Sequence, residues 1–366
     1  MNKYKQKNYC YRTPLNKLKH WSKKLVIYAV TIFIFTILII LLANAFYKPS
    51  SVRLYQWLSP QVISKDELEI ITWNLGYGGL GKDSNFVFDG GTDWRPKSKV
   101  VVEQNVSGII NFLKSATPDL FLFQEIAKPS FMNYRVNVLD SVVAALPKYQ
   151  HIYISDFQTR LIPAPLSINS GLAVFAKLGL VSSSESRLLP LEPRRLGAFR
   201  KYYQMVVNHI PTTIKDKEWI VINLHLAAFD SDADVRAKQM QEVRSFAKEQ
   251  YQRGNFVVIG GDWNLRLAKT YFPHTTEEKY LFWIHDLPDD AFPSGWKIVA
   301  DSSVPSVRTL HKEYVPNENY VTVIDGFITS PNVENMLVET KDLGFANSDH
   351  NPVSAKFTVI DKEIPM

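Results

Sequence analysis

The sequence has only one cysteine, Cys10, among its 366 residues. One thiol cannot form an intramolecular disulfide, and it cannot supply the several sulfur ligands of a structural zinc site. Disulfide-stapled scaffolds and cysteine-rich zinc domains are therefore excluded, and no disulfide-linked partner is expected. With 46% hydrophobic and 21% charged residues, the chain is too apolar to be intrinsically disordered and is long enough for one large domain or two ordinary ones.

Acidic residues are absent from the first 24 positions. This segment holds eight of the 42 Lys and Arg residues, which leaves 34 basic residues against 36 acidic residues in the rest of the chain. The net charge of +6 therefore comes from the N-terminal tail alone, and the remainder sums to −2. An RNA-binding arm is one interpretation of the tail, but the hydrophobic run that follows it favours a role at a membrane.

The segment Leu25–Phe46 contains 22 residues and no charge. At about 1.5 Å per residue, such a helix matches the roughly 30 Å hydrocarbon core of a bilayer. The alternative is a cleaved signal peptide, because Ala43-Asn44-Ala45 has the form of a cleavage site. The apolar run before that site is 18 residues long, which exceeds the roughly 7–15 residues of a signal peptide, so a retained transmembrane helix is the favoured prediction.

The flanking charges predict the orientation of this helix. Eight basic residues precede it, whereas Lys48 and Arg53 are the only charged residues among the 18 positions after it. Since the positive flank stays inside, we expect a single-pass cell-membrane protein with a basic cytoplasmic tail (1–24), a transmembrane helix (25–46), a linker (47–67) and one extracytoplasmic domain (68–360).

Short β-rich runs and amphipathic helices alternate along the domain. Many consecutive strands have only turns between them, which favours a sandwich of mixed β-sheets flanked by helices over a simple doubly wound sheet. A further helix, Glu277–His285, is expected in the aromatic segment 271–296, whose alternative role is an aromatic wall for an apolar part of a substrate. The expected strands are Leu68–Trp73, Leu120–Phe123, His151–Ile154, Leu172–Phe175, Trp219–Leu224, Phe256–Ile259, Val321–Thr329 and Val353–Val359, and the two clear helices are Lys97–Lys114 and Ala233–Arg253.

Polar side chains repeatedly follow the hydrophobic strands. Strand ends on one side of a sheet are a usual position for a functional site, because rigid strands hold groups that converge there. Each residue alone has a structural explanation, such as an Asx turn or a helix cap, so the indication lies in the whole set and its order. The set comprises Asn74, Glu125, His225, Asp262, Asn264, Asp325, Asp349 and His350.

The run Gly76-Tyr77-Gly78-Gly79-Leu80-Gly81 has the spacing of a dinucleotide-binding motif. That motif needs a helix opening at its last glycine, but the following residues have no helical period. We therefore expect a glycine-rich loop over the site instead.

The ordered motifs W-N, Q-E, N-x-H-L, G-D-x-N, I-D and S-D-H-N-P-V resemble those of the endonuclease/exonuclease/phosphatase superfamily, over residues 68–359. The resemblance implies a four-layer α/β sandwich and hydrolysis of phosphate esters by direct attack of water. The residue types fit this chemistry, because oxygen ligands suit Mg²⁺, with Mn²⁺ as an alternative, and a phosphodiester needs donors on its oxygens.

The resemblance also implies individual roles. Asn74 and Glu125 would form the divalent metal site with Asp349 nearby, and Asp262 would align or deprotonate the attacking water. His225 would donate to the phosphate, and His350, oriented by Asp325, would contact the scissile phosphate. The phosphate contacts would be completed by Asn264 and by Asn169, whose match is the loosest.

The substrate stays open between a lipid head group, a nucleotide or another small phosphorylated molecule, and a nucleic acid. Duplex binding draws on Lys and Arg to neutralise phosphates, and the charge of −2 outside the tail disfavours it. The alternatives, in order, are a phosphodiesterase or phosphatase on a lipid or small substrate, a membrane-anchored nuclease, and a catalytically silent binding protein. The residues that could form a local basic patch are Arg187, Arg194, Arg195, Arg200 and Lys201.

Overall fold

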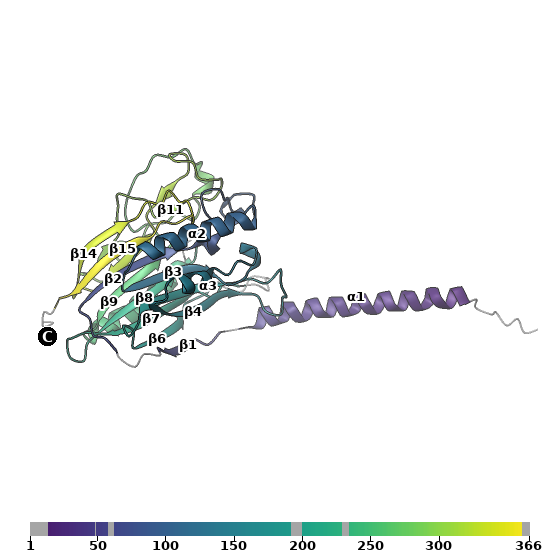
Figure 1. Ribbon diagram of the computed structural model, residues 1–366, viewed down its shortest axis with the longest axis horizontal. Coiled ribbons are helices and arrows are strands. Elements are labelled where there is room, and N and C mark those ends of the chain that lie inside the picture. Colours follow the sequence, from purple (N-terminus) through teal and green to yellow (C-terminus); the bar gives the residue numbers. More distant parts are fainter. Residues whose placement is uncertain (1–13, 48, 58–61, 192–199, 229–233, 361–366) are drawn as a thin grey trace, which may run out of the picture.

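The computed structural model describes residues 14–47, 49–57, 62–191, 200–228 and 234–360. Two stacked β-sheets with helices on both outer faces form the domain, and a long helix extends away from it (Figure 1). One sheet has six strands in the order β14-β15-β2-β3-β5-β4, and the other has seven in the order β1-β6-β7-β8-β9-β13-β10. A small third sheet pairs β11 with β12.

The strands of the six-stranded sheet are β2 (Glu67–Asn74), β3 (Leu120–Ala127), β4 (Tyr149–Gln158), β5 (Asn169–Lys177), β14 (Val333–Thr340) and β15 (Val353–Val359). Those of the seven-stranded sheet are β1 (Val52–Gln56), β6 (Ser183–Leu188), β7 (Gln204–Pro211), β8 (Glu218–His225), β9 (Phe256–Asp262), β10 (Lys297–Val299) and β13 (Asp325–Thr329). The small sheet contains β11 (Val307–Arg308) and β12 (Val321–Thr322). The helices are α1 (Pro14–Phe46), α2 (Lys99–Ser115), α3 (Val138–Ala145) and α4 (Asp234–Gln252).

Alternation along the strands builds the layers. Ile70 of β2 faces the core between the sheets, whereas its neighbour Ile71 faces α2 and α3. On the other sheet, Val258 of β9 faces the inner core and Ile259 faces α4. Because successive side chains in a strand point to opposite faces, the continuous apolar runs of the central strands bury both faces of each sheet. The result is a four-layer α/β sandwich, which confirms the expected fold class.

Two parallel strand pairs define one edge of the sandwich. Helix α2 connects β2 to the parallel strand β3, and α4 connects β8 to the parallel strand β9. Gln124, which pairs with the last residue of β2, donates to Asn223 near the end of β8 (2.7 Å), so the carboxyl ends of both pairs meet. We call this side of the sandwich the carboxyl edge.

The expected helix Glu277–His285 is wrong. Only a single 3₁₀ turn, Glu278–Tyr280, forms there. A further turn follows, in which the Ile284 amide donates to the Leu281 carbonyl (3.0 Å). The chain then pairs with the segment after β9: the Arg266 amide donates to the His285 carbonyl (2.8 Å), and the Leu287 amide donates to the Arg266 carbonyl (3.1 Å). The backbone from His285 onward therefore pairs with Arg266 across the fold and does not continue as a helix. The run Val321–Thr329, expected as one strand, is divided between β12 and β13, which belong to different sheets.

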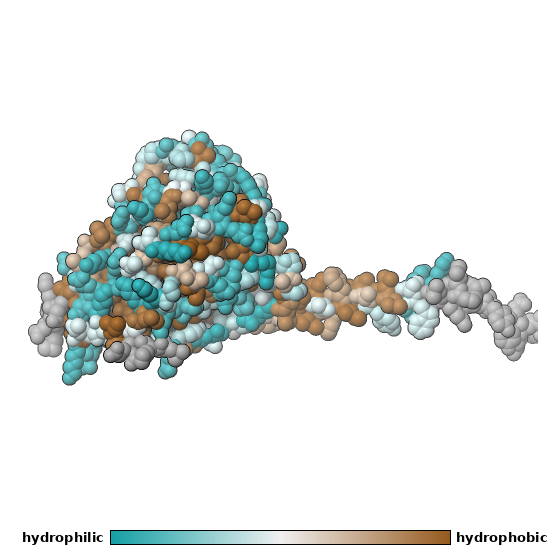
Figure 2. Space-filling view, viewed as in Figure 1, coloured by the Kyte–Doolittle hydropathy of each residue, from teal (hydrophilic) through white to brown (hydrophobic). Residues whose placement is uncertain are grey.

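The segment expected as a linker contains β1, which pairs antiparallel with β6 and forms an edge of the seven-stranded sheet. Helix α1 extends from the domain, and its portion Lys19–Phe46 is long and apolar enough to span a membrane, because its most apolar 18-residue stretch has a mean hydropathy of 3.1. A signal sequence would meet the same criterion. Figure 2 shows the hydrophobic surface of α1 continuing up to the body of the domain.

Polar contacts fix the domain end of α1. The Asn44 side chain donates to the Arg160 carbonyl (2.9 Å) and accepts from the Arg160 amide (2.8 Å). The Arg160 guanidinium lies over the Tyr47 ring, 3.3 Å from its centroid, and the Tyr202 hydroxyl donates to the Tyr47 carbonyl. We call Asn44, Tyr47, Arg160 and Tyr202 the helix clamp.

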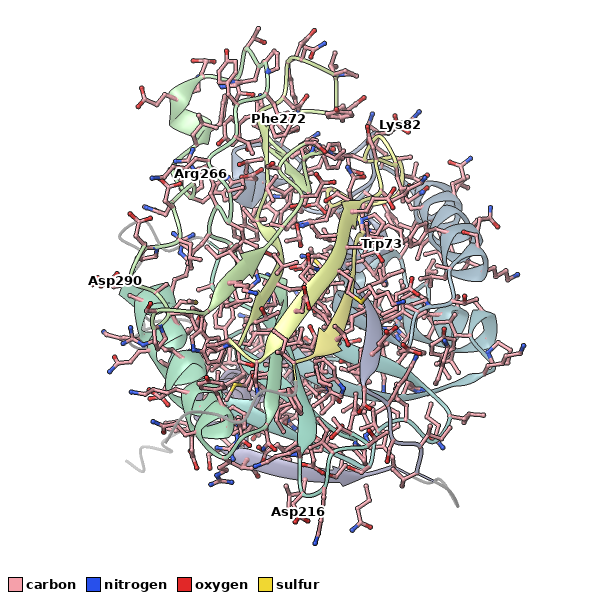
Figure 3. All side chains as sticks on the ribbon, turned by 90° about the vertical axis from the view of Figure 1, so that its left-hand side faces the viewer. Trp73, Lys82, Asp216, Arg266, Phe272 and Asp290 are labelled. Carbon is pink, nitrogen blue, oxygen red and sulfur yellow. The ribbon has the colours of Figure 1, made fainter. Side chains whose placement is uncertain are left out.

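The helix clamp lies at the carboxyl edge. Gln158 ends β4 beside Asn169, and Ser170 pairs with Ala127 at the end of β3, so Arg160 follows at the same end of the sheet. The opposite edge carries the turn between β7 and β8. Asp216, in that turn, lies at the far end of the molecule from Lys82 (Figure 3).

Candidate active site

The expected site residues converge in one pocket at the carboxyl edge. Seven of the nine line it directly, and an eighth, Asp325, hydrogen-bonds from β13 to a lining residue. Asn169, the ninth, does not line the pocket in the described part of the chain. It begins β5, and its side-chain amide oxygen accepts a hydrogen bond from the Tyr153 hydroxyl (2.7 Å). The lining residues that the sequence had indicated are Asn74, Glu125, His225, Asp262, Asn264, Asp349 and His350.

Strand register places the central residues. Asp262 at the end of β9 lies opposite His225 of β8 on one side and Asp325 of β13 on the other. This register requires Gly261, whose φ is +147° and whose added Cβ would lie 2.1 Å from the Leu224 carbonyl oxygen. A glycine therefore lets β9 approach β8 closely enough to set Asp262 beside His225.

Asp262 Oδ2 is the point on which the site converges. Asn74 Nδ2 donates to it (2.9 Å), while His225 Nε2 lies 3.5 Å away and His350 Nε2 lies 3.7 Å away. The other carboxylate oxygen accepts from the Asn264 amide (3.0 Å). Burial raises the pKa of Asp262 to about 6, which the positive charge of His350 partly opposes.

Asp325 sets the charge of His350. Its Oδ2 lies 2.8 Å from His350 Nδ1, and both groups are buried. Burial alone would lower the pKa of His350, but the carboxylates of Asp325, Asp262 and Asp349 together raise it to about 10. The imidazolium therefore presents its Nε2 proton to the pocket. The Trp73 indole donates to the His350 carbonyl (2.9 Å) and fixes the backbone of this loop.

His225 is neutral. Burial lowers the pKa of His225 well below its usual range, and the charges of Lys201 and His350 lower it further. Lys201 Nζ lies 3.1 Å from His225 Nδ1. An ammonium group has no acceptor, so Nδ1 must accept this hydrogen bond and the single ring proton resides on Nε2, which faces Asp262. The two histidines thus direct two N–H donors toward the same carboxylate.

Glu125 reaches the pocket through a β-bulge. The pairing of β3 with β5 shifts register between Phe123 and Ile126, and Glu125 has a φ of +52°. Such a bulge redirects a side chain at the end of a strand. The Tyr77 hydroxyl donates to Glu125 Oε1 (2.8 Å), and Lys201 Nζ lies 3.6 Å from the same oxygen.

The carboxylates of the site can hold a metal ion. Burial raises the pKa of Glu125, Asp156, Asp262 and Asp349, because it removes water from their charged forms. A bound cation would stabilise these charged carboxylates and offset that cost. Ligand atoms of Asp262, Asp325 and His350 lie within 4.8 Å of one another. A protonated His350 cannot ligate through nitrogen, so the oxygen donors of Asn74, Glu125 and Asp349 suit a hard divalent cation better.

Four residues in or beside the pocket were assigned no role from the sequence motifs: Tyr77, Asp89, Asp156 and Lys201. Of these, Lys201 was considered only as part of a basic patch. It contacts Glu125 and His225 and lies 3.8 Å from Asp156. Another patch residue, Arg187, pairs with Glu185, whereas Arg194 and Arg195 lie outside the described residues. Nothing local in the sequence marks Lys201, because β4, β3 and β8 bring its partners together only in the fold.

No protein-family model and no curated protein sequence matches the chain. Solved structures do match. An endonuclease/exonuclease/phosphatase protein from Beutenbergia cavernae superposes with a TM-score of 0.55 at 13% identity, covering 81% of this chain and 72% of that one. A Bacteroides vulgatus protein of the same description gives 0.52 at 16% identity, covering 81% and 100%. The chain therefore has the endonuclease/exonuclease/phosphatase fold.

A further match is Danio rerio TDP2 complexed with a single-strand DNA product. It superposes with a TM-score of 0.50 at 15% identity, over 81% of this chain and all of that one. At such identities the likeness establishes the fold, and the expected resemblance is confirmed at that level.

Proposed function

We propose that this protein is a divalent-metal-dependent phosphoesterase that hydrolyses phosphodiesters by in-line attack of water. The observation that carries the proposal is the convergence of two histidine N–H groups and an amide on Asp262, beside oxygen donors suited to a cation. A carboxylate surrounded by phosphate-binding donors suits a base that acts on water next to a bound phosphate.

Each residue has a proposed role. Asp262, whose pKa is near 6 through burial, is ionised at neutral pH and accepts a proton from the attacking water. The His350 imidazolium and the neutral His225 donate from Nε2 to the phosphate oxygens, and Asp325 holds His350 in its charged form. Asn264, and by resemblance Asn169, are phosphate contacts.

We propose that Asn74, Glu125 and Asp349 hold Mg²⁺ or Mn²⁺. Asn74 and Asp349 are neighbours, because Ser348 Oγ donates to the Asn74 carbonyl (2.7 Å) and lies 3.3 Å from Asp349 Oδ1. When bound, such an ion would offset the charge of the phosphate and of the carboxylates. Lys201 already places one positive charge beside Glu125, so the chain itself supplies part of this compensation.

We further propose that α1 anchors the protein in the cell membrane with the domain outside the cytoplasm. The helix clamp ties the domain end of α1 to the carboxyl edge. Tyr202 of the clamp is the sequence neighbour of Lys201, which lies beside Glu125 of the site. The pocket would then lie on the side of the domain from which α1 leaves. This placement favours a lipid head group, or a small phosphorylated molecule at the membrane surface, as substrate.

The second candidate is a membrane-anchored nuclease. The TDP2 structure with a single-strand DNA product favours it, and the charge of −2 outside the tail opposes it. A catalytically silent binding protein is the third candidate. Both histidines lie close to Asp262 in an arrangement suited to catalysis, which argues against this third candidate.

One experiment separates the candidates. Full-length protein in detergent micelles is assayed with Mg²⁺, with Mn²⁺ and with EDTA on bis-p-nitrophenyl phosphate, phospholipid, DNA and RNA. We expect metal-dependent release of product from the small diester and the lipid. Asp262→Asn should abolish it, while the matched control Asp216→Asn, at the exposed opposite edge, should retain it. Activity confined to DNA or RNA would establish the nuclease, and no turnover on any substrate would contradict the enzyme.

A further inference from the structure

The loop between β4 and β5 is apolar at its tip. Residues 161–166 read Leu-Ile-Pro-Ala-Pro-Leu and include no polar side chain. Five of these six residues are exposed, and Leu161 and Leu166 have exposed fractions of 63% and 60%. A contiguous exposed apolar run is typical of a surface that contacts a partner or a membrane. None of the proposed catalytic roles uses this segment, which we call the apolar tip.

The apolar tip projects from the carboxyl edge, where β4 ends and β5 begins. Thr159 and Ile168 still pair across the hairpin: the Thr159 amide donates to the Ile168 carbonyl (3.0 Å), and the Ile168 amide donates to the Thr159 hydroxyl (2.8 Å). The chain then reverses in a turn, in which the Leu166 amide donates to the Pro163 carbonyl (3.1 Å). The apolar tip therefore lies beyond the last cross-strand contact of the hairpin.

The apolar tip begins beside the domain end of α1, which leaves the domain near β4 (Figure 1). Arg160 immediately precedes the tip, and its main chain makes both hydrogen bonds with the Asn44 side chain. Asn44 is 7% exposed and lies one helical turn, or about 5 Å, before Tyr47 along α1. Tyrosine is enriched at the level of the lipid head groups. If Tyr47 lies at that level, the main chain that enters the tip is level with the last apolar turn of the helix.

The backbone of the apolar tip suits an apolar environment. Irregular backbone is costly in lipid because its polar groups need partners. Pro163 and Pro165 have no N–H group, and the amide of Leu166 is already bonded within the turn. Half of the six positions therefore need no donor partner from outside the loop.

We propose that the apolar tip inserts into the lipid interface next to α1 and gives the domain a second contact with the membrane. The proposal rests on the membrane anchoring proposed above and is independent of the catalytic roles. A bilayer is the partner because the apolar helix leaves the domain at the same point, and because the tip offers no side-chain hydrogen bond to a protein. A single helix lets the domain turn about the helix axis, whereas a second contact fixes which side of the domain faces the lipid.

Fluorescence quenching measures the depth of the apolar tip. Full-length protein carrying Cys10→Ser receives one new cysteine at a time, through Leu161→Cys, Leu166→Cys, Ile34→Cys or Leu178→Cys, and each is labelled with bimane. The proteins are reconstituted into phosphatidylcholine vesicles with a nitroxide lipid, which carries the nitroxide either near the head group or near the end of the acyl chain. We expect the shallow nitroxide to quench the labels at positions 161 and 166, and the deep nitroxide to quench the label at position 34.

Leu178 is the matched control. It is an exposed leucine, with an exposed fraction of 53%, and it directly follows the last residue of β5. The nine residues of β5 separate it from the loop by roughly 30 Å at 3.3 Å per residue. A label there should therefore be quenched by neither nitroxide.

A charge in the apolar tip gives a second measurement. Leu166→Asp should reduce shallow quenching of the label at position 161, because a carboxylate is costly among acyl chains. Leu178→Asp should leave that quenching unchanged. Both leucines are exposed, so neither variant should lower the melting temperature.

The outcomes separate the insertion from the anchor. If the label at position 34 is quenched but those at 161 and 166 are quenched no more than the label at 178, the insertion is overturned and the anchor stands. Full quenching at position 161 in the Leu166→Asp protein would also contradict the insertion. An unquenched label at position 34 would contradict the anchor and, with it, the insertion. No measurement uses turnover, so the phosphoesterase proposal is tested separately.

Discussion

His350 and Asp325 are 25 positions apart in the sequence and form a buried hydrogen-bonded pair in the fold. We expect His350→Gln to reduce turnover by about 10²–10⁴-fold, because it removes a charged donor positioned for the phosphate. Asp325→Asn should cost less, and the double variant should cost far less than the product of the two effects, since the residues act as a unit. Turnover and melting temperature are measured on the same samples. A stable, fully active His350→Gln protein would refute the catalytic role.

Glu125→Gln tests the metal site. Removing one negative charge from the ligand set should raise the Mg²⁺ concentration needed for half-maximal activity. The matched variant is Glu185→Gln, in β6, whose carboxylate pairs with Arg187. An unchanged Mg²⁺ requirement in Glu125→Gln would remove Glu125 from the ligand set.

The charge of His350 also predicts a pH dependence of stability. Its pKa in the folded protein is raised by three carboxylates to about 10, above the value of about 6.5 in an unfolded chain. The stabilisation from its charged form is therefore fully present below about pH 6.5 and is lost as the pH rises toward 10. In EDTA, the excess unfolding free energy of the wild type over His350→Gln should shrink across that range. An excess that is constant or grows would show that His350 is neutral.

At the scale of elements, Gly261 determines how closely β9 passes β8. Gly261→Ala should destabilise the protein by more than about 2 kcal/mol, because the new Cβ meets the Leu224 carbonyl oxygen and the backbone is strained as well. Gly344→Ala separates the two effects: its φ is +59° but nothing lies within 4 Å, so only the roughly 1–2 kcal/mol of the left-handed conformation applies. Chemical denaturation measures both. Equal losses would show that the close approach carries no cost.

Elements with regular apolar patterns were predictable, and elements that depend on distant partners were not. The strand Val353–Val359 was expected with the bounds it has. Strands β1 and β6, in contrast, carry polar sequences such as SSESRL and form only because β7 extends the sheet toward them. The extended segment around His285 took its backbone partners from Arg266, which no local pattern of the aromatic segment reveals.

At the scale of the whole molecule, the anchor and its orientation are the testable feature. A C-terminal reporter that is active only outside the cytoplasm should give signal, and the membrane fraction should contain the full-length chain. Replacing the eight basic residues of the tail with Gln should reduce the signal, because the proposed orientation depends on them. A soluble, shortened protein beginning near Phe46 would establish a cleaved signal peptide instead.

The sequence by itself determined the apolar N-terminal helix, from its uncharged length, and a sandwich of mixed β-sheets flanked by helices, from its short strands joined by turns. The ordered motifs at the strand ends indicated the polar residues that meet around Asp262, and their resemblance to a known superfamily implied the four layers. Only the tertiary structure decided that Lys201 contacts Glu125 and His225, that Asp89 and Trp283 face one pocket, and that the helix clamp joins α1 to the carboxyl edge. The physical reason is that hydrogen bonds and charges act over a few ångströms in space, and the folding of the two sheets brings together groups that the chain separates by many residues.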